Sequence, residues 1–308
     1  MRRSARLLIF LIPLALCSCT KPAAVRGDGW PPKLRYLVSI SQENPEAEAS
    51  RLAPIKDYLQ AEMQMPVEIV ASSGYGVAIE AMRAHQIEAC TLGPFAYLLA
   101  SEKAGAEVVV TRGKLDGSPG SYAGGFAVTA ESPLKSIEDV VKQAKNLTIS
   151  FVDPASASGN LVQRAYLDSA RINPEKDFKK VVFAQAHMTS ALTLLAGKTD
   201  VAAIGDSIIP ALEKNGQVRK GALRYIWMSP PIPEGPVAVR KDLPESFKRK
   251  LRDALVAMRS KAPDAYFNMS AKVYMDRYKV LTFTPANDAV FDPLRKLARG
   301  VKSVQLLD

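Results

Sequence analysis

Cysteine and histidine are scarce in this sequence, with three cysteines and two histidines in 308 residues. A metal cluster or a Cys/His dyad needs several such side chains close together, so we expect neither. The sequence also lacks a Gly-x-Ser-x-Gly segment and a nucleotide-type phosphate loop. Ser156 and His187 offer a nucleophile and a base, but a passive anion site uses the same groups. We therefore expect neither an enzyme nor a cofactor.

Long apolar runs are also missing, and the clearest short run lies at the start of the chain. Leu7–Leu16 is about ten residues long and follows three arginines. A membrane-spanning helix needs roughly twenty residues, so this run is typical of the core of a secretory signal. The segment Leu16-Cys17-Ser18-Cys19 resembles a bacterial lipobox, in which the chain is cleaved before the lipidated cysteine.

We therefore expect a lipoprotein signal peptide at residues 1–18, a lipid on Cys19 and a tether over residues 19–33. Acyl chains on Cys19 would anchor the exported chain to a bacterial membrane, facing the periplasm. The alternative is an ordinary signal peptide that contains cysteine. With Cys19 modified, Cys90 is the remaining thiol of the mature chain, which excludes an intramolecular disulfide.

The charge has a basic excess without a basic cluster. Lysine and arginine number 41 against 31 aspartates and glutamates, for a net charge of +10. A nucleic-acid-binding protein gathers such charges on one face among aromatic residues. Here they are scattered, with small groups at Lys248-Arg249-Lys250 and Arg295-Lys296 on expected helices. We expect a solvated basic surface and no nucleic-acid partner, with a bias toward meeting anions.

Segments typical of strands and helices alternate along the mature chain, whose roughly 290 residues exceed one comfortable core. This alternation indicates parallel strands joined by crossover helices. The expected strands are 35–40, 66–70, 89–92, 107–111, 125–129, 147–151, 181–183, 201–204, 223–228 and 236–240. The expected helices are 46–63, 77–84, 95–104, 136–143, 159–170, 189–196, 207–215, 247–260 and 264–276.

Two breaks divide this series, a Gly/Ser-rich one at 113–126 and a Pro-rich one at 229–238. They predict that the chain crosses twice between two lobes. Lobe 1 would comprise residues 34–120 and 236–308, and lobe 2 residues 121–235. Such a hinge closes on a ligand bound between the lobes.

The segment FVDPASASGN, residues 151–160, is the strongest candidate for a binding site. A strand is expected to end at Phe151 and a helix to begin near Gly159, and ligands of α/β sheets bind at such strand ends. The free N–H groups and the dipole of a helix start favour an anion. Ser156 and Ser158 add hydroxyl donors. The alternative is a simple helix N-cap by Ser or Asp.

This segment resembles the phosphate-binding loop of the phosphonate/phosphite-type periplasmic binding proteins that serve ABC transporters. Three further segments resemble that family in the same order: GYGVAIEAMRAHQIEACTLGPFAYLLA, AHMTSALTLLAGKTDVAAIGDS and SPPIPEGPVAVRKDLP. The resemblance extends over most of the mature chain. It implies an α/β fold of the two-lobe, type II binding-protein class, with a mixed sheet flanked by helices in each lobe and a two-strand hinge.

The resemblance also implies which residues hold the ligand, a small phosphorus oxyanion such as phosphonate, phosphite or phosphate. Ser156, Ser158 and the backbone of Ala157 and Gly159 would hold the phosphoryl oxygens. The family usually has threonine where this chain has Ala157, which removes one hydroxyl donor. A hydrogen bond to a charged group contributes about 1.5–3 kcal/mol, so this loss would weaken phosphonate binding or signal another ligand.

Four more residues complete the implied site. Tyr75 and Tyr97 would face the anion from the other lobe, and His187 would donate to an oxygen. Asp206 would accept from a protonated oxygen or an amino group. Each has an alternative role: Tyr97 as a core aromatic, His187 as a structural or surface residue, and Asp206 as a helix cap.

The implied partner of a monomeric binding protein is an ABC permease. A membrane receptor or sensor kinase is the alternative, and the sequence does not separate transport from sensing.

Overall fold

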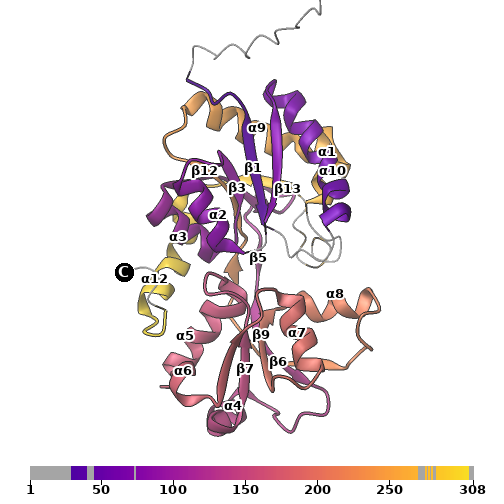
Figure 1. Cartoon of the computed structure of the whole chain (residues 1–308), viewed down its shortest axis with the longest axis vertical. Coiled ribbons are helices and arrows are strands. Elements are labelled where there is room, and N and C mark those ends of the chain that lie inside the picture. Colours follow the sequence, from indigo (N-terminus) through magenta and orange to yellow (C-terminus); the bar gives the residue numbers. More distant parts are fainter. Residues whose placement is uncertain are drawn as a thin grey trace, which may run out of the picture.

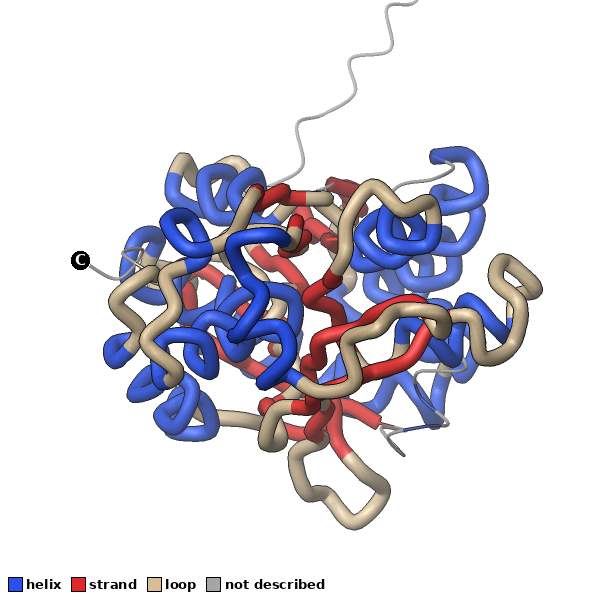
Figure 2. Tube along the Cα trace, turned by 90° about the horizontal axis from the view of Figure 1, so that it is seen from below, coloured by secondary structure: helices blue, strands red, loops and turns tan. Residues whose placement is uncertain are grey.

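The computed structural model describes residues 29–39, 45–72, 74–269, 275, 277, 279 and 282–304. The expected signal peptide and Cys19 lie outside these residues. Figure 1 shows two lobes stacked along the long axis of the molecule, each built around one sheet. Viewed from the lobe 2 end, helices surround the strands of both sheets (Figure 2).

Lobe 1 is built on a six-stranded sheet of described strands in the order β13-β4-β12-β3-β1-β2. These strands are β1 (Leu34–Ser39), β2 (Val67–Ser72), β3 (Ala89–Thr91), β4 (Ala106–Gly113), β12 (Pro236–Arg240) and β13 (Thr282–Pro285). Its helices are α1 (Pro45–Met63), α2 (Tyr75–Arg83), α3 (Pro94–Ala104), α9 (Glu245–Lys261), α10 (Pro263–Asn268), η3 (Asp288–Phe291) and α12 (Asp292–Gly300). Helices α1, α9 and α10 contribute to one core, and α2, α3 and α12 to another.

Lobe 2 is built on a five-stranded sheet of described strands in the order β10-β6-β9-β7-β8. These are β6 (Gly124–Thr129), β7 (Thr148–Phe151), β8 (Lys180–Phe183), β9 (Val201–Gly205) and β10 (Leu223–Met228). Its helices are α4 (Ile137–Gln143), η1 (Ala144–Asn146), η2 (Ala157–Leu161), α5 (Val162–Ser169), α6 (Pro174–Asp177), α7 (His187–Leu195) and α8 (Ile208–Lys214). Helices α4 and α5 contribute to the core on one side, and α7 and α8 to the core on the other.

Two short strands, β5 (Ser121–Tyr122) and β11 (Ile232–Pro233), pair antiparallel where the chain passes between the sheets. They lie in the two breaks that the sequence identified as crossings. The exact boundaries at residues 120 and 236 stay predictions. The six-stranded sheet contains strands from before the first crossing and after the second, and the five-stranded sheet contains the strands between the two crossings.

Both sheets are mixed, as the family resemblance implied, and not wholly parallel, as the alternation alone suggested. Strands β1, β2 and β3 are parallel, and so are β7, β8 and β9. Strand β12 runs antiparallel to β3 and β4, and β6 runs antiparallel to β9 and β10. These two strands follow the crossings directly, so no helix precedes them to reverse the chain.

The C-terminal part of the chain contains a strand that the sequence did not predict and a helix, around Arg295-Lys296, for which it gave no bounds. Strand β13 pairs antiparallel with β4, and helix α12 packs against both α3 of lobe 1 and α5 of lobe 2. Phe291 and Leu294 enter an apolar cluster that also holds Leu161 and Val162 of lobe 2. The expected helix 264–276 corresponds to the shorter α10 over the part that is described.

The folded part of the chain begins within the expected tether, residues 19–33. Trp30 is only 8% exposed, its ring lies 5.3 Å from that of Phe247, and its Nε1 donates to Ser246 Oγ at 2.8 Å. Residues from Trp30 onward therefore belong to lobe 1, and a tether would end before them.

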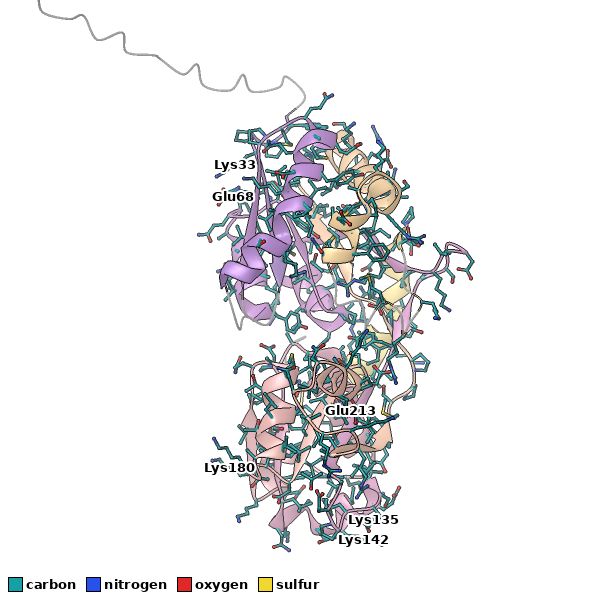
Figure 3. The ribbon with its side chains drawn as sticks, turned by 90° about the vertical axis from the view of Figure 1, so that its right-hand side faces the viewer. Lys33, Glu68, Lys135, Lys142, Lys180 and Glu213 are labelled. Carbon is teal, nitrogen blue, oxygen red and sulfur yellow. The ribbon has the colours of Figure 1, made fainter. Side chains whose placement is uncertain are left out.

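Many of the basic residues are exposed on the outer surface, whereas Arg164, Arg240 and Lys248 are buried. Lys135 and Lys142 are exposed near each other at the end of lobe 2, Lys180 is exposed on another side of that lobe, and Lys33 lies on lobe 1 (Figure 3). The Lys33 ammonium is paired with Glu68.

Candidate functional site

A cavity of about 250 Å³ lies where the two lobes meet. Both lobes and both crossings contribute to its wall. The lining residues are Tyr75, Thr91, Leu92, Gly93, Pro94 and Arg112 before the crossings, Tyr122, Glu234 and Gly235 in them, and Ser158, His187, Gly205, Ser207 and Ile208 in lobe 2. Because it lies between two sheets joined by a hinge, it is the site where closure would enclose a ligand.

The predicted anion loop follows β7 and forms a tight helix start. Ser156 is the N-cap, and its Oγ accepts the N–H of Gly159 at 3.0 Å. The next residues form a π-helical turn, which is rare and occurs often at functional sites. First-turn N–H groups have no partner within the helix. With that of Gly159 satisfied by Ser156, those of Ala157 and Ser158 remain to donate to an anion.

The anion loop packs closely against the backbone at the start of β6. A side chain at Gly124 would place its Cβ 2.6 Å from the Ser158 carbonyl oxygen, so only glycine fits. The Gln163 side chain is fully buried, and its Nε2 donates to the Ser158 carbonyl at 2.7 Å and to the Gly125 carbonyl at 3.0 Å. These contacts tie Ser158 to the start of β6.

Gly159 and Ser156 therefore support the loop and do not line the cavity. The Gly159 carbonyl accepts the N–H of Val152 at 2.8 Å, and a Cβ at Gly159 would lie 2.4 Å from Val152 Cγ2. Gly159 thus has a packing role, and its expected contact with the ligand stays a prediction. Of the two serines, Ser158 lines the cavity.

His187 starts α7 and reaches the same end of the cavity. Its Nδ1 accepts the Gly205 N–H at 3.1 Å. Burial lowers the pKa of His187 to about 4, so the ring is neutral at neutral pH. A neutral ring that accepts at Nδ1 carries its proton at Nε2. His187 is therefore an uncharged donor.

Two tyrosines place hydroxyl groups at the cavity. Burial raises the pKa of Tyr75 to about 12 and that of Tyr122 well above its usual value, so both remain protonated donors. Tyr122 is hydrogen-bonded with Ser158. The ring of Tyr75 lies against Gly93, where a Cβ would be 3.1 Å from the hydroxyl oxygen. The sequence predicted Tyr75 but missed Tyr122.

Tyr97 is not among the residues that line this cavity, and its expected ligand role stays a prediction. The side chain is 1% exposed, and its hydroxyl donates to Asp288 Oδ1 at 2.7 Å. Its ring centroid lies 4.7 Å from that of Phe291. Both partners come from the C-terminal part of the chain, which covers this face of α3. Tyr97 is a core aromatic, the alternative that the sequence left open.

Ala157 and Asp206 lie beside the cavity. Ala157 is 2% exposed and packs in the apolar cluster shared by the two lobes, so its methyl group is directed away from an anion. Asp206 lies between the lining residues Gly205 and Ser207, and its Oδ2 is 3.9 Å from Arg277. Ser207 immediately precedes α8, and Asp206 comes one residue earlier.

The sequence missed the charged pair of the cavity. Arg112 belongs to β4 and Glu234 to the second crossing, with 3.9 Å between Arg112 Nη1 and Glu234 Oε2. Glu234 falls in the Pro-rich break, and Arg112 lies between the expected strand 107–111 and the Gly/Ser-rich break, so neither was considered as a ligand contact. Because the hinge of a two-lobed protein forms the floor of its cleft, polar residues in the crossings were the signal that would have found them.

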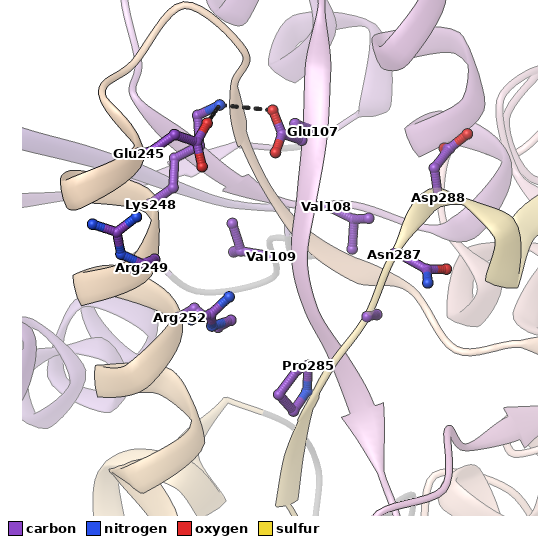
Figure 4. A pocket seen from close by; sticks show the side chains of 11 residues that line it. Glu107, Val108, Val109, Glu245, Lys248, Arg249, Arg252, Pro285, Asn287 and Asp288 are labelled. Carbon is purple, nitrogen blue, oxygen red and sulfur yellow. Dashed lines mark hydrogen bonds and ion pairs between the residues drawn. The ribbon is translucent and has the colours of Figure 1, made fainter.

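A larger cavity of about 550 Å³ lies within lobe 1, away from the junction (Figure 4). Its wall carries as many acidic as basic groups, and Lys248 Nζ is bonded to Glu107 at 2.7 Å and to Glu245 at 2.8 Å. Among the described residues, no group of His, Cys, Asp and Glu side chains is placed to hold a metal ion. None of the described helices has the length and apolar character for a membrane crossing.

Comparison with known proteins agrees with this geometry. Residues 37–291 match the family model described as "ABC transporter, phosphonate, periplasmic substrate-binding protein". The chain belongs to this family. The match covers both lobes and both crossings, and it identifies a periplasmic binding protein of ABC transport and not an enzyme, as the sequence predicted.

Individual relatives show the same similarity. The chain is 28% identical to the phosphonates-binding periplasmic protein of Escherichia coli, over 86% of this chain and 77% of that one. A binding component of an ABC phosphonate transporter from Pseudomonas aeruginosa is 27% identical, with a TM-score of 0.74 over 86% and 85% of the two chains. A Prochlorococcus marinus protein in complex with methylphosphonate has 19% identity and a TM-score of 0.73 over 89% and 99%, which shows the shared type II fold.

Proposed function

We propose that this binding protein captures a small phosphorus oxyanion, a phosphonate, phosphite or phosphate, at the anion loop and delivers it to an ABC permease. The observation that carries the proposal is a set of uncharged donors at one end of the cavity. They are the Ser158 hydroxyl and backbone N–H and His187 Nε2, and Ala157 precedes Ser158 at the same helix start. A helix start and neutral donors are what a tetrahedral oxyanion requires.

The acidic residues nearby set a condition on that ligand. Glu234 is 1% exposed and Asp206 is 6% exposed, so neither is freely hydrated. A dianion facing a buried carboxylate would be repelled. The ligand should therefore turn a protonated oxygen or an N–H group toward this side of the cavity.

Calorimetric titration of residues 20–308, which include every described element, tests the proposal. The ligands are phosphate, phosphite, methylphosphonate, 2-aminoethylphosphonate and sulfate. We expect saturable binding of at least one phosphorus oxyanion and a loss of roughly tenfold or more in affinity for Ser158→Ala. Ser260→Ala, an exposed serine on α9, is the matched control and should bind normally. No binding by any phosphorus compound would reject the proposal.

We also infer that Cys19 is lipidated and holds the protein at the membrane. The lipobox-like segment supports this, and so does the start of the fold at Trp30, about ten residues after Cys19. Mass spectrometry of the protein purified from membranes should show a diacylated Cys19. Cys19→Ser should release the chain as a soluble periplasmic protein, whereas Cys17→Ser should leave it anchored. Release by Cys17→Ser alone would contradict the assignment.

A further inference from the structure

The lobe 1 side of the cavity carries two opposite charges side by side. Glu234 is buried at 1% exposure, and Arg112 has a side-chain exposure of 19%. Their 3.9 Å separation is an ion-pair distance beyond direct hydrogen-bond contact. A buried carboxylate is costly without a cation nearby, and Arg112 supplies that charge. Arg112 Nη2 also donates to the Met269 carbonyl at 3.4 Å, so the wall combines a guanidinium that is already held in place with a carboxylate of opposite charge beside it.

The charged pair and the anion loop belong to opposite sides of one cavity. Ser158 and His187 come from lobe 2, whereas Arg112 and Glu234 come from β4 and the second crossing. Tyr122 of the first crossing lines the same cavity, and its hydroxyl is hydrogen-bonded with Ser158. A phosphoryl group at the loop would therefore direct its fourth substituent toward Arg112 and Glu234.

Each charge excludes a simple substituent of its own sign. Arg112 would repel an ammonium group placed beside it, and Glu234 would repel a carboxylate. A substituent that carries both an ammonium and a carboxylate satisfies both, with the carboxylate at Arg112 and the ammonium at Glu234. Guanidinium groups suit carboxylates because their paired N–H donors match the two oxygens.

Resting on the proposed function, we infer that the preferred ligand is a phosphonate that ends in an amino-acid head group, an ammonium and a carboxylate on one carbon. The cavity of about 250 Å³ is smaller than the roughly 300–1,000 Å³ typical for drug-sized ligands. It suits a short compound in which about two carbons separate phosphorus from the charged groups. Arg112 and Glu234 are the residues that set this specificity.

Four phosphonates with the same two-carbon spacing test the inference by calorimetry on residues 20–308. 2-Amino-3-phosphonopropionate carries both charges, 2-aminoethylphosphonate the ammonium, 3-phosphonopropionate the carboxylate, and ethylphosphonate neither. We expect the first to bind at least about tenfold more tightly than each of the others, as hydrogen bonds between charged groups predict. Affinities of all four within threefold of one another would overturn the inference.

Two variants assign the charges. Arg112→Gln should weaken 2-amino-3-phosphonopropionate about tenfold or more, strengthen 2-aminoethylphosphonate, and leave ethylphosphonate within threefold. Glu234→Gln should instead strengthen 3-phosphonopropionate. Equal losses for all four ligands would show a structural role for the pair and overturn the assignment. If Arg112→Gln does not fold, Arg112→Lys keeps the charge, and the ligand series on the native protein decides alone.

The outcomes separate this inference from the proposed function. Binding of ethylphosphonate or phosphate with no preference among head groups would reject the inference and keep the oxyanion site. Failure of every phosphorus compound, including phosphate and phosphite, would reject both.

Discussion

The anion loop and His187 of lobe 2 contribute uncharged donors to the cavity, whereas β4 and the second crossing contribute the charged Arg112–Glu234 pair. The loop after β7 offers backbone N–H groups and a serine hydroxyl, and His187 adds a neutral imidazole. The opposite side offers the Arg112–Glu234 pair and the Tyr75 hydroxyl. The tetrahedral anion, which all candidate ligands share, would thus meet fixed dipoles, while the variable substituent would meet side chains.

This difference has a structural cause. The loop is fixed by short contacts of the backbone with Gly124, Gln163 and Val152, so its donors are placed before a ligand arrives. Preorganised donors lose little conformational freedom on binding. Arg112 and Glu234 instead belong to the crossing region, where a change of side chain alters charge without displacing the loop. We expect lobe 2 to determine affinity for the oxyanion and the crossing region to determine which oxyanion is chosen.

The largest effect should follow from disturbing the loop backbone. In Gly124→Ala, the added Cβ would lie 2.6 Å from the Ser158 carbonyl oxygen, so the loop must move. Loss of two donors to the anion predicts a roughly hundredfold weaker affinity, and overpacking predicts about 1–3 kcal/mol lower stability. Calorimetry and thermal unfolding measure these two quantities.

Gly300→Ala is the matched control, because a Cβ there meets nothing within 4 Å. It should bind like the native protein. Native affinity in Gly124→Ala would show that lobe 2 adapts to its ligand, and the contrast with lobe 1 would then disappear.

A smaller effect should separate the two tyrosines of lobe 1. Tyr97→Phe removes a 2.7 Å hydrogen bond to Asp288, which predicts a stability loss of about 1–2 kcal/mol and an unchanged oxyanion affinity. Tyr75→Phe removes a hydroxyl at the cavity, which predicts an affinity loss of roughly threefold to tenfold and little change in stability. Denaturant unfolding and calorimetry on both variants measure the difference. The reverse pattern would place Tyr97 at the ligand site.

The uncharged state of His187 can be tested through the pH dependence of stability. Burial holds the pKa of His187 at about 4, whereas the unfolded chain has the usual value near 6.5. Between these values the unfolded state binds more protons, so the free energy of unfolding falls as pH decreases from about 6.5 to 4. Between pH 7 and pH 5, the free energy of unfolding of His187→Gln should therefore fall by about 1–2 kcal/mol less than that of the native protein, as measured by denaturant unfolding at both pH values. If the free energy of unfolding fell equally in the variant and the native protein, burial would not oppose protonation of His187, and the ring would be a charged donor at mildly acidic pH.

The sequence predicted the anion loop because its determinants are local. A buried strand, small hydroxyl residues and a helix start follow one another within ten residues, and the structure shows this order at β7, η2 and α5. The two lobes were predictable for a similar reason, since strands and helices alternate with two breaks. Cores built from such regular elements leave a periodic pattern in the sequence.

The parts that were missed depend on contacts between distant segments. Tyr97 is buried by Asp288 and Phe291, about 190 residues later in the chain, so its own helix does not show which way it points. Arg112 and Glu234 meet only after both crossings are in place. Strand β13 is four residues long and pairs with β4 from the first half of the chain. No short-range pattern reports such pairings.

The smallest effect should come from Ala157, where the sequence suggested a lost donor. Its methyl group is 2% exposed and lies in the apolar cluster between the lobes, so a hydroxyl added there would enter the cluster and not the cavity. Ala157→Ser should therefore leave oxyanion affinity within threefold, while the buried hydroxyl lowers stability by about 1–2 kcal/mol. The Ala157 N–H, which we propose as a donor to the anion, is unchanged in this variant. A tenfold gain in affinity would show instead that the side chain at this position reaches the ligand, and that side chains as well as backbone determine affinity in lobe 2.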